Sequence, residues 1–500
     1  MLRDLVGAKD PYATEGDVTS LPFTHGIEVE YLVTTNKGQT FGHGAFEKAY
    51  QMLINDRLKR DIEARIPDYY KKKVKELSIS QSSGSSYEAL FLKYETRHGV
   101  IESEIISVDR NVAEWPLIEA ATPPCETLYE LAWWSSSIQA LVSSAVRATG
   151  LGASILACGT SPMEDIQKIV SGESFATCGE HHHLAVYAPG QEAEFTKFYH
   201  LIRAFIPSLL LMTSDSTFAS GKPSGRIRLN DPEMPFPRCA NTLRVMNNRK
   251  HLCDFHDGEY IPYLASGWKG KENFIEEFQK QSGSFRKDSH FLDVDPLSKA
   301  GTTEIRIFDS QPSVARRIGV AAILQMIAHS AFNYVGTDPM PVLDLPSREL
   351  FNLKRLVCDA GPWARPTRTS MFNPPVKRLK KTGVEKELLS DLALEMGWYL
   401  HKSGILMGVL NSRFLYPIRH TIYGAGGKGI CLSQHWLLKF AKNGGQMPAI
   451  ISEMMSAVEK SANLWYDPIV YDPVRFPVPQ NDDVQQEPQT LQEGKDDSGP

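Results

Sequence analysis

Alternating apolar and polar positions mark several short strands in the first 310 residues of the chain. Successive strand residues point to opposite faces, so an apolar residue at every second position indicates one buried face. The pattern predicts strands at residues 26–33, 99–108, 115–122, 181–186, 225–229 and 302–310. Most of these strands keep one apolar and one polar face, so we expect one face of each to be buried.

Apolar residues at helical spacing dominate the last third of the chain. They predict helices at 313–334, 346–360, 384–410, 433–443 and 447–464, after earlier helices at 45–66, 126–150 and 192–213. Strands that cluster early and helices that cluster late favour an α+β fold over an alternating α/β fold. The helix at 126–150 ends at a glycine, which suits a C-terminal cap.

The organisation indicates one large catalytic domain over residues 1–478, with a sheet-rich part at 22–310 and a helical lobe at 311–478. Residues 68–90 mix lysines with a serine-rich run, so we expect an insertion or a flexible excursion there, with the insertion at about 55–112. From about residue 479 large apolar side chains almost vanish, which predicts a disordered tail over 479–500.

Composition places the chain among globular proteins of reducing compartments. It has 500 residues, 42% hydrophobic and 23% charged, and its formal charge of −5 makes nucleic acid an unlikely main partner. The seven cysteines are scattered and never spaced as CxxC, so we expect a cytoplasmic protein without a disulfide framework. The longest apolar segment, 318–332, is too short to span a bilayer, and no signal peptide is evident, so no membrane partner is expected.

Candidate chemistry gathers on the polar faces of the predicted strands. These faces carry Glu28, Glu30, Glu119, His181, His183, Arg226, Arg228, Glu304 and Arg306. A wet amphipathic edge explains any one such strand, but wet faces usually carry Lys, Thr, Ser and Gln. If the strands form one sheet, the carboxylates would repel one another unless a cation relieves the repulsion. Mg²⁺ with phosphate oxygens, and arginines that bind phosphate in bidentate fashion, would do so, which predicts a cation-bridged polyphosphate site.

Five segments in order carry a resemblance to a known family. They are GIEVE at 26–30, LIEAATPPC at 117–125, CGEHHH at 178–183, SGRIRL at 224–229 and GTTEIRIFD at 301–309, followed by an arginine-containing, glycine-rich segment at 411–427. Over roughly residues 22–465 the chain resembles the carboxylate–amine ligase family of glutamate–cysteine ligases, in particular its second, bacterial and archaeal type.

The resemblance implies a curved antiparallel sheet related to that of glutamine synthetase, with a funnel-shaped polar concave face covered by helices. It also implies phosphorylation of a substrate carboxylate by ATP, with Mg²⁺, followed by attack of an amine. Glutamate is the expected carboxylate, through its γ-carboxyl, and cysteine is the default amine, giving γ-glutamylcysteine for glutathione biosynthesis. A homo-oligomer is compatible with the chain.

The same resemblance assigns roles to individual residues. Metal positions fall on Glu28, Glu30, Glu119, His181 and Glu304, with His183 beside them as a further metal-site residue. Glu304, Arg226 and Arg306 are expected to act in catalysis, and the nucleotide or the acyl phosphate is expected to contact Arg226, Arg228, Arg306, Arg413 and Arg419. The remaining histidine of the triplet, His182, is interpreted as a core residue on the back face.

Three alternatives remain open at this stage. The amine acceptor could be another amino acid, a polyamine, a peptide or a tRNA-borne group, with the basic runs at 71–75 and 376–381 either as docking sites or as solvated surface. The chain could be a non-catalytic nucleotide-binding or regulatory protein. It could also be a zinc hydrolase, although neighbouring strand residues point to opposite faces, so at most two of the three histidines can share one ion.

Overall fold

The computed structural model describes a large part of the chain. The described residues are 20–39, 48, 50–82, 87–108, 117–165, 168, 177–223, 263–264, 267–282, 293–298, 300–333, 340–341, 343–360, 372–373, 389–410, 412–423 and 430–472. Within them, no helix is both long and apolar enough to cross a bilayer.

The largest element is a ten-stranded sheet in which every described strand pair is antiparallel. Its order is β11-β12-β8-β1-β5-β4-β3-β2, with β6 and β7 also paired to β1. The strands are β1 (Ser20–Thr35), β2 (Val74–Gln81), β3 (Glu88–Thr96), β4 (Gly99–Val108), β5 (Leu117–Ala121), β6 (Cys125–Thr127), β7 (Ala153–Leu156), β8 (Gly179–Leu184), β11 (Val294–Asp295) and β12 (Thr303–Asp309). Two further pairs are β9 (Phe218–Ala219) with β10 (Lys222–Pro223) and β13 (Met340–Pro341) with β14 (Phe372–Asn373).

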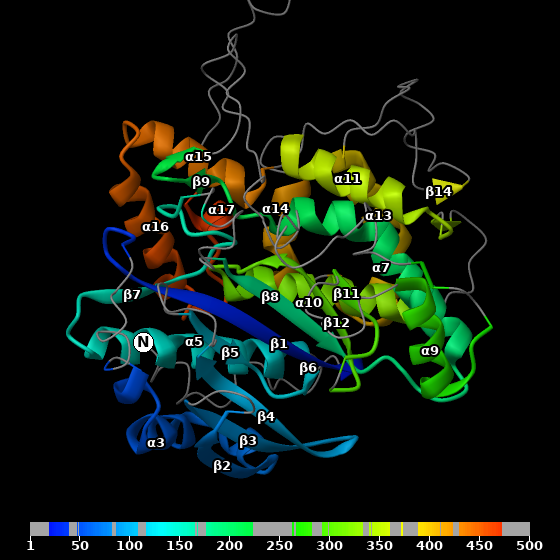
Figure 1. Ribbon diagram of the computed structural model, residues 1–500, viewed down its shortest axis with the longest axis horizontal. Helices are drawn as coiled ribbons and strands as arrows, with labels where there is room; N and C mark the ends of the chain where they lie inside the picture. The colour runs from blue at the N-terminus through cyan, green and yellow to red at the C-terminus, as the bar shows by residue number, and fades with distance from the viewer. Residues whose placement is uncertain are drawn as a thin grey trace, which may run out of the picture.

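The helices are mostly those that the apolar spacing predicts. The longer ones are α3 (Asp56–Arg65), α5 (Leu128–Ala148), α7 (Glu192–Thr213), α9 (Gly270–Ser282), α10 (Val314–Asn333), α11 (Ser347–Ala360), α13 (Leu389–Leu406), α15 (Leu432–Lys442) and α16 (Met447–Lys460). The shorter ones are α4 (Asp68–Lys71), η4 (Arg413–Leu415), α14 (Tyr416–Tyr423) and α17 (Pro468–Tyr471). The predicted mixed α+β class, with a large antiparallel sheet covered by helices, is confirmed (Figure 1).

Helix α5 shows how local sequence sets these boundaries. The Thr127 hydroxyl accepts a hydrogen bond from the Glu130 amide at 3.0 Å, which satisfies one of the unpaired donors of the first turn. At the other end Gly150 takes a φ of +70°, the left-handed conformation that favours glycine after a last turn. The expected helix with its glycine cap is therefore confirmed.

Helices α5 and α10 cover one face of the sheet, here called the back face (Figure 1). Tyr31 of β1 donates to Gln139 of α5 at 2.7 Å, and Arg317 of α10 donates to Glu180 of β8 at 3.0 Å. The main hydrophobic core lies here and extends along α7 and α10. Helix α10 is buried nearly all round, which explains its continuous apolar sequence.

The opposite face, here called the front face, is only partly covered by apolar packing. A second hydrophobic cluster joins Leu32 and Leu117 of the sheet to Trp436 of α15 and Ile450 of α16. Strand alternation places Leu32 on the same face as Glu28 and Glu30. Helices α15 and α16 therefore cover one end of the front face, and a polar surface continues from there.

Of the two expectations for residues 68–90, an insertion or a flexible excursion, the flexible excursion is not what the structure has. Residues 74–81 form β2 within this range and residues 88–96, which begin at its end, form β3, and these strands extend the main sheet beyond β4. The alternation of apolar and polar residues in β2 is weak, and Leu77 is its single buried residue. Cross-strand pairing with β3, which is better buried, compensates for that weak pattern.

Candidate functional site

The polar surface of the front face is built from four adjacent strands. The register of β1 places Glu28 opposite His181 of β8, and the register of β12 places Glu304 opposite His183. On the other side of β1, Glu30 lies opposite Glu119 of β5. Directly paired residues of antiparallel strands point to the same face. The sheet thus brings together side chains that are up to 276 positions apart in the chain, Glu28 and Glu304.

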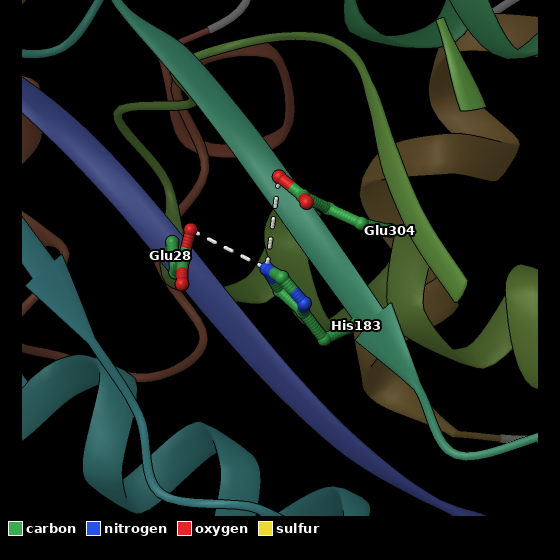
Figure 2. Close-up of side chains that lie close together, drawn as sticks. All are labelled: Glu28, His183 and Glu304. Carbon is green, nitrogen blue, oxygen red and sulfur yellow. Dashed lines mark ion pairs between the residues drawn. The ribbon is translucent and has the colours of Figure 1, made fainter. Parts of the chain in front are cut away.

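Glu28, His183 and Glu304 form the first group of candidate metal ligands. One ligand atom from each lies within 4.8 Å of the others. His183 Nε2 is 3.3 Å from Glu28 Oε2 and 3.9 Å from Glu304 Oε1. Figure 2 shows the imidazole between the two carboxylates, with the three side chains on neighbouring strands. An arrangement of two carboxylates around one imidazole suits a divalent cation.

Glu28 also belongs to a second group, with Glu119 and His181, whose ligand atoms again lie within 4.8 Å of one another. His181 Nδ1 is 3.4 Å from Glu28 Oε2 and 3.6 Å from Glu304 Oε1, so the two groups are contiguous. On the other edge of the ring, His181 Nε2 is 3.9 Å from Glu30 Oε1. We call these six residues, Glu28, Glu30, Glu119, His181, His183 and Glu304, the cation cluster.

The orientation of His183 fits a metal ligand. Its Nδ1 lies 3.0 Å from the Thr302 hydroxyl, which fixes the plane of the ring. Its Nε2 is buried and has no hydrogen-bond partner among the described residues. A buried polar atom without a partner is costly, and an imidazole anchored at one nitrogen while the other faces carboxylates is the usual arrangement around a metal. The residues present therefore fit a bound cation.

Carboxylates outnumber guanidiniums in and beside the cluster among the described residues. Of its four carboxylates, that of Glu304 pairs with the Arg306 guanidinium. Burial by itself would raise the pKa of Glu28, but the neighbouring imidazoles of His183 and His181 outweigh it and hold that pKa well below its ordinary value. Glu28 is consequently an ionised carboxylate near neutral pH. Its side chain is 32% exposed, which leaves it open to a ligand.

Other residues hold the cluster in place without belonging to it. The Gly179 amide donates to Glu30 Oε2 at 2.7 Å, which orients a carboxylate that is only 4% exposed. Neither Gly179 nor Thr302 stands out in the sequence as a candidate. Both lie next to recognisable site residues, on CGEHHH and GTTEIRIFD, so position within those motifs was the available signal.

The predicted arginines divide into three cases. Arg306 lies in the site, 13% exposed. Arg226 and Arg228 lie outside the described residues. Arg413 and Arg419 are on η4 and α14, where Arg413 stacks over the Trp465 ring at 5.5 Å and Arg419 donates to the Leu410 carbonyl.

The structure does not bring Arg413 and Arg419 to the cation cluster. Gly319 of α10 lies directly against the backbone of Phe414 in η4, so this segment packs on the helix that covers the back face. The glycine-rich loop that follows, at 424–429, lies outside the described residues. The printed contacts of both arginines are thus with Trp465 and Leu410 and not with the cation cluster, and their nucleotide role stays a prediction.

His182 lies on the back face as predicted. It is fully buried, and its Nε2 lies 2.9 Å from Glu180 Oε1. Its other nitrogen, Nδ1, lies 2.9 Å from His25 Nε2. The three histidines of the triplet therefore do not converge on one point.

Comparisons with known proteins give structural matches alone. No protein-family model matches the chain, and no curated protein sequence matches it. Among solved structures, a bifunctional glutathione synthetase from Pasteurella multocida is similar with a TM-score of 0.47 and 12% identity, covering 89% of this chain and 52% of that one. The chain thus spans about half the length of that protein.

Two further structures are similar at a lower level. A glutamate–cysteine ligase from Francisella tularensis in complex with AMP has a TM-score of 0.41 and 12% identity, over 88% of this chain and 93% of that one. The complex between the prokaryotic ubiquitin-like protein Pup and its ligase PafA gives 0.33 and 11%, over 89% and 64%. Similarity at this level carries no functional conclusion.

Proposed function

We propose that this protein is an ATP-dependent carboxylate–amine ligase. The observation that supports it best is the pair of ligand groups that share Glu28, with the Arg306 guanidinium at their edge. A site of that composition suits a polyphosphate bridged by divalent cations. The reaction class comes from the five motifs, whose order along the chain resembles that of the glutamate–cysteine ligases.

Mg²⁺ is the proposed cation. One ion would be held by Glu28, His183 and Glu304 and a second by Glu28, Glu119 and His181, with Glu30 behind them. When bound, the cations neutralise phosphate charge and align the γ-phosphoryl group for transfer.

The chain's own residues supply orientation and charge stabilisation. Arg306, fixed by Glu304, offers planar donors to the oxygens on which charge develops. Arg226 and Arg228 are proposed to join it from the segment at 224–229. Thr302 and Gly179 keep His183 and Glu30 in place, so that the cluster needs little reorganisation when substrates bind.

The proposed substrates are glutamate and an amine. The γ-phosphoryl group of ATP passes to a γ-carboxylate oxygen, and ADP leaves. The amine nitrogen then attacks the carbonyl carbon of the acyl phosphate, phosphate leaves with the bonding electrons, and the amine loses a proton. Cysteine is the default amine because of the resemblance alone, and another amino acid, a polyamine or a peptide would use the same chemistry.

The test is ADP release by the purified protein with ATP, Mg²⁺ and glutamate across a panel of amines, with products identified by mass. We expect one amine to stimulate turnover. Glu304→Gln should lower that turnover at least about 1,000-fold, roughly 4 kcal/mol of transition-state stabilisation, because it removes a ligand charge and the partner of Arg306. The matched control is Glu102→Gln on β4, whose side chain is 54% exposed and should leave turnover unchanged.

A Glu304→Gln variant that folds and keeps near-normal turnover would refute the metal role of this carboxylate. Absence of ADP release with every amine would instead favour a non-catalytic nucleotide-binding protein.

A zinc hydrolase is the second candidate, because each ligand group contains an imidazole, a ligand that suits zinc. Elemental analysis of the purified protein decides this point. Stoichiometric zinc that survives dialysis, together with no ATP turnover, would favour the hydrolase.

A further inference from the structure

A separate cavity is lined by residues of α15 and α16, by Pro468 of α17 and by residues on either side of α17. Figure 1 shows these three helices near one another. The volume of the cavity is about 170 Å³. The residues that matter in its lining are His435, Trp436, Lys439, Glu453, Lys460 and Asp472. No residue of the cation cluster lines it. Since one water takes up roughly 30 Å³ in the liquid, the cavity has room for a compact ion or for several waters.

Two buried side chains in this lining have unused hydrogen-bonding groups. His435 is 1% exposed, and neither ring nitrogen has a hydrogen-bond partner among the described residues. Trp436 is also 1% exposed, and its Nε1 is likewise without a partner in the described part of the chain. Leaving a buried polar group unsatisfied costs about 1–3 kcal/mol, so two neighbouring cases, neither matched within the described residues, favour a bound ligand as the source of the partners.

The carboxylates of the lining are already matched within the protein. Glu453 receives the Lys439 ammonium at 3.0 Å and the Asn443 amide at 2.8 Å. Asp472 receives the Lys460 ammonium at 3.2 Å and the Tyr466 hydroxyl at 2.9 Å.

Hydrogen-bond donors of the lining remain available beyond these ion pairs. Each ammonium carries three N–H donors and is engaged in one of these ion pairs, and the indole of Trp436 can only donate. Burial, followed by the charges of Lys439 and Arg316, lowers the pKa of His435 to about 3, although the Asp472 carboxylate opposes this. The imidazole thus stays neutral near pH 7 and keeps one N–H to donate.

We propose that this cavity binds a compact oxyanion, such as phosphate, sulfate or the carboxylate group of a small molecule. The Trp436 indole and the Lys439 ammonium donate to its oxygens, and His435 completes the contacts. Charge-assisted hydrogen bonds of this kind are the stronger ones, and they replace the missing partners of both buried rings. The site is independent of the proposed ligase reaction, since it shares no lining residue with the cation cluster.

The experiment is a titration of the intact chain with inorganic phosphate at constant ionic strength. The readout is the ¹⁵N-indole resonance of Trp436, assigned by its loss in Trp436→Phe, with the other seven tryptophans as internal controls. We expect a saturable shift confined to Trp436. Lys439→Gln should weaken binding at least tenfold. The matched control is Lys442→Gln, an exposed position on the same helix outside the cavity, which should bind as the wild type does.

Parallel titrations with sulfate and acetate separate the possible sources of the oxyanion. Saturation by phosphate and sulfate but not acetate identifies a tetrahedral anion, and saturation by acetate extends the site to carboxylates; both results support the proposal. A Trp436 resonance that does not move, or that moves equally with chloride, overturns it. If Lys439→Gln does not fold, Ser456→Asp puts a carboxylate into the lining and should abolish the shift; unchanged phosphate binding by that variant also overturns the proposal.

Discussion

Histidines and glutamates lie together on both faces of the sheet at strand β8, but their hydrogen-bonding environments differ. On the front face, His181 and His183 lie among the carboxylates Glu28 and Glu304, at separations of 3.3–3.9 Å. Among the described residues, the four carboxylates of the cluster lie with one guanidinium, that of Arg306, and the buried Nε2 of His183 has no hydrogen-bond partner. On the back face, the histidine and the glutamate of β8 belong to a hydrogen-bonded chain.

That chain can be followed atom by atom. The Gln325 amide nitrogen lies 3.2 Å from His25 Nδ1, so His25 accepts there and donates from Nε2 to His182 Nδ1 at 2.9 Å. His182 Nε2 then donates to Glu180 Oε1 at 2.9 Å, and Arg317 donates to Glu180 Oε2 at 3.0 Å. Each of these groups has its partner inside the protein, and Glu180 and Arg317 balance each other's charge.

The difference separates structural from functional polar residues. A buried network whose donors and acceptors are matched needs no ligand, and it fixes the positions of the elements that it joins. A cluster with surplus charge and a partnerless nitrogen costs stability unless a ligand completes it. Residue type alone does not distinguish the two, since both contain glutamate and histidine. The balance of charges and partners does.

The largest effect is expected from Arg317→Met, which breaks the back-face chain. Arg317 is fully buried and contacts Glu180, Ser135 Oγ at 2.6 Å and the Gln311 carbonyl at 2.8 Å. Removing its charge leaves Glu180 ionised and buried, so the free energy of unfolding should fall by about 3–5 kcal/mol. Urea denaturation followed by circular dichroism measures this. Restored stability in Arg317→Met combined with Glu180→Leu would show that the lone charge is the cause, whereas a single variant as stable as wild type would contradict the comparison.

The next effect is expected from Glu28→Gln, which acts on the front face. Glu28 is shared by both ligand groups, so affinity for Mn²⁺, used as a probe for the proposed Mg²⁺ sites, should fall at least 100-fold, or about 2.7 kcal/mol. The metal-free protein should lose some stability, though less than in Arg317→Met, because the imidazoles of His183 and His181 favour the charged carboxylate that the variant removes. Electron paramagnetic resonance of free Mn²⁺ and chemical denaturation in EDTA give the two numbers. A variant that loses as much stability as Arg317→Met and keeps its Mn²⁺ affinity would reverse the assignment of the two faces.

The sequence predicted the front face well because its signal is local. Period-two alternation in each strand identifies which side chains share a face, and Glu28, His181 and Glu304 follow from it. That these strands are neighbours does not follow from alternation. It came from the resemblance of the motifs, and the observed order β12-β8-β1-β5 agrees with it.

The back-face chain was harder to predict because its contacts are long-range. Arg317 lies 137 positions from Glu180, within a helix whose sequence indicates only burial. His25 and Gln325 are 300 positions apart and belong to no motif. The contacts of Arg413 and Arg419 have the same origin, since packing between helices, and not strand periodicity, decides where η4 and α14 lie.

The smallest effect concerns pH and tests the back face again. Burial, followed by the nearby His182 and His183, lowers the pKa of His25 well below 6.5, so the folded protein keeps this imidazole neutral while the unfolded chain takes up a proton near pH 6.5. Acid therefore favours the unfolded state: the contribution is constant above about pH 6.5 and stability is lost as pH falls below it, by at most about 1.4 kcal/mol per pH unit for this one group.

His200 and His435, whose pKa values burial lowers to about 4 and about 3, add to the same slope, so the difference between wild type and His25→Gln isolates the effect. In EDTA, the variant should show a smaller loss of unfolding free energy between pH 6.5 and 5.5 than the wild type, because glutamine has no proton to take up. Identical slopes would mean that His25 becomes protonated in the folded state. The back-face chain would then carry two positive charges, those of His25 and Arg317, against the single carboxylate of Glu180. Its charges would no longer be matched within the protein, and the contrast with the cation cluster would fail.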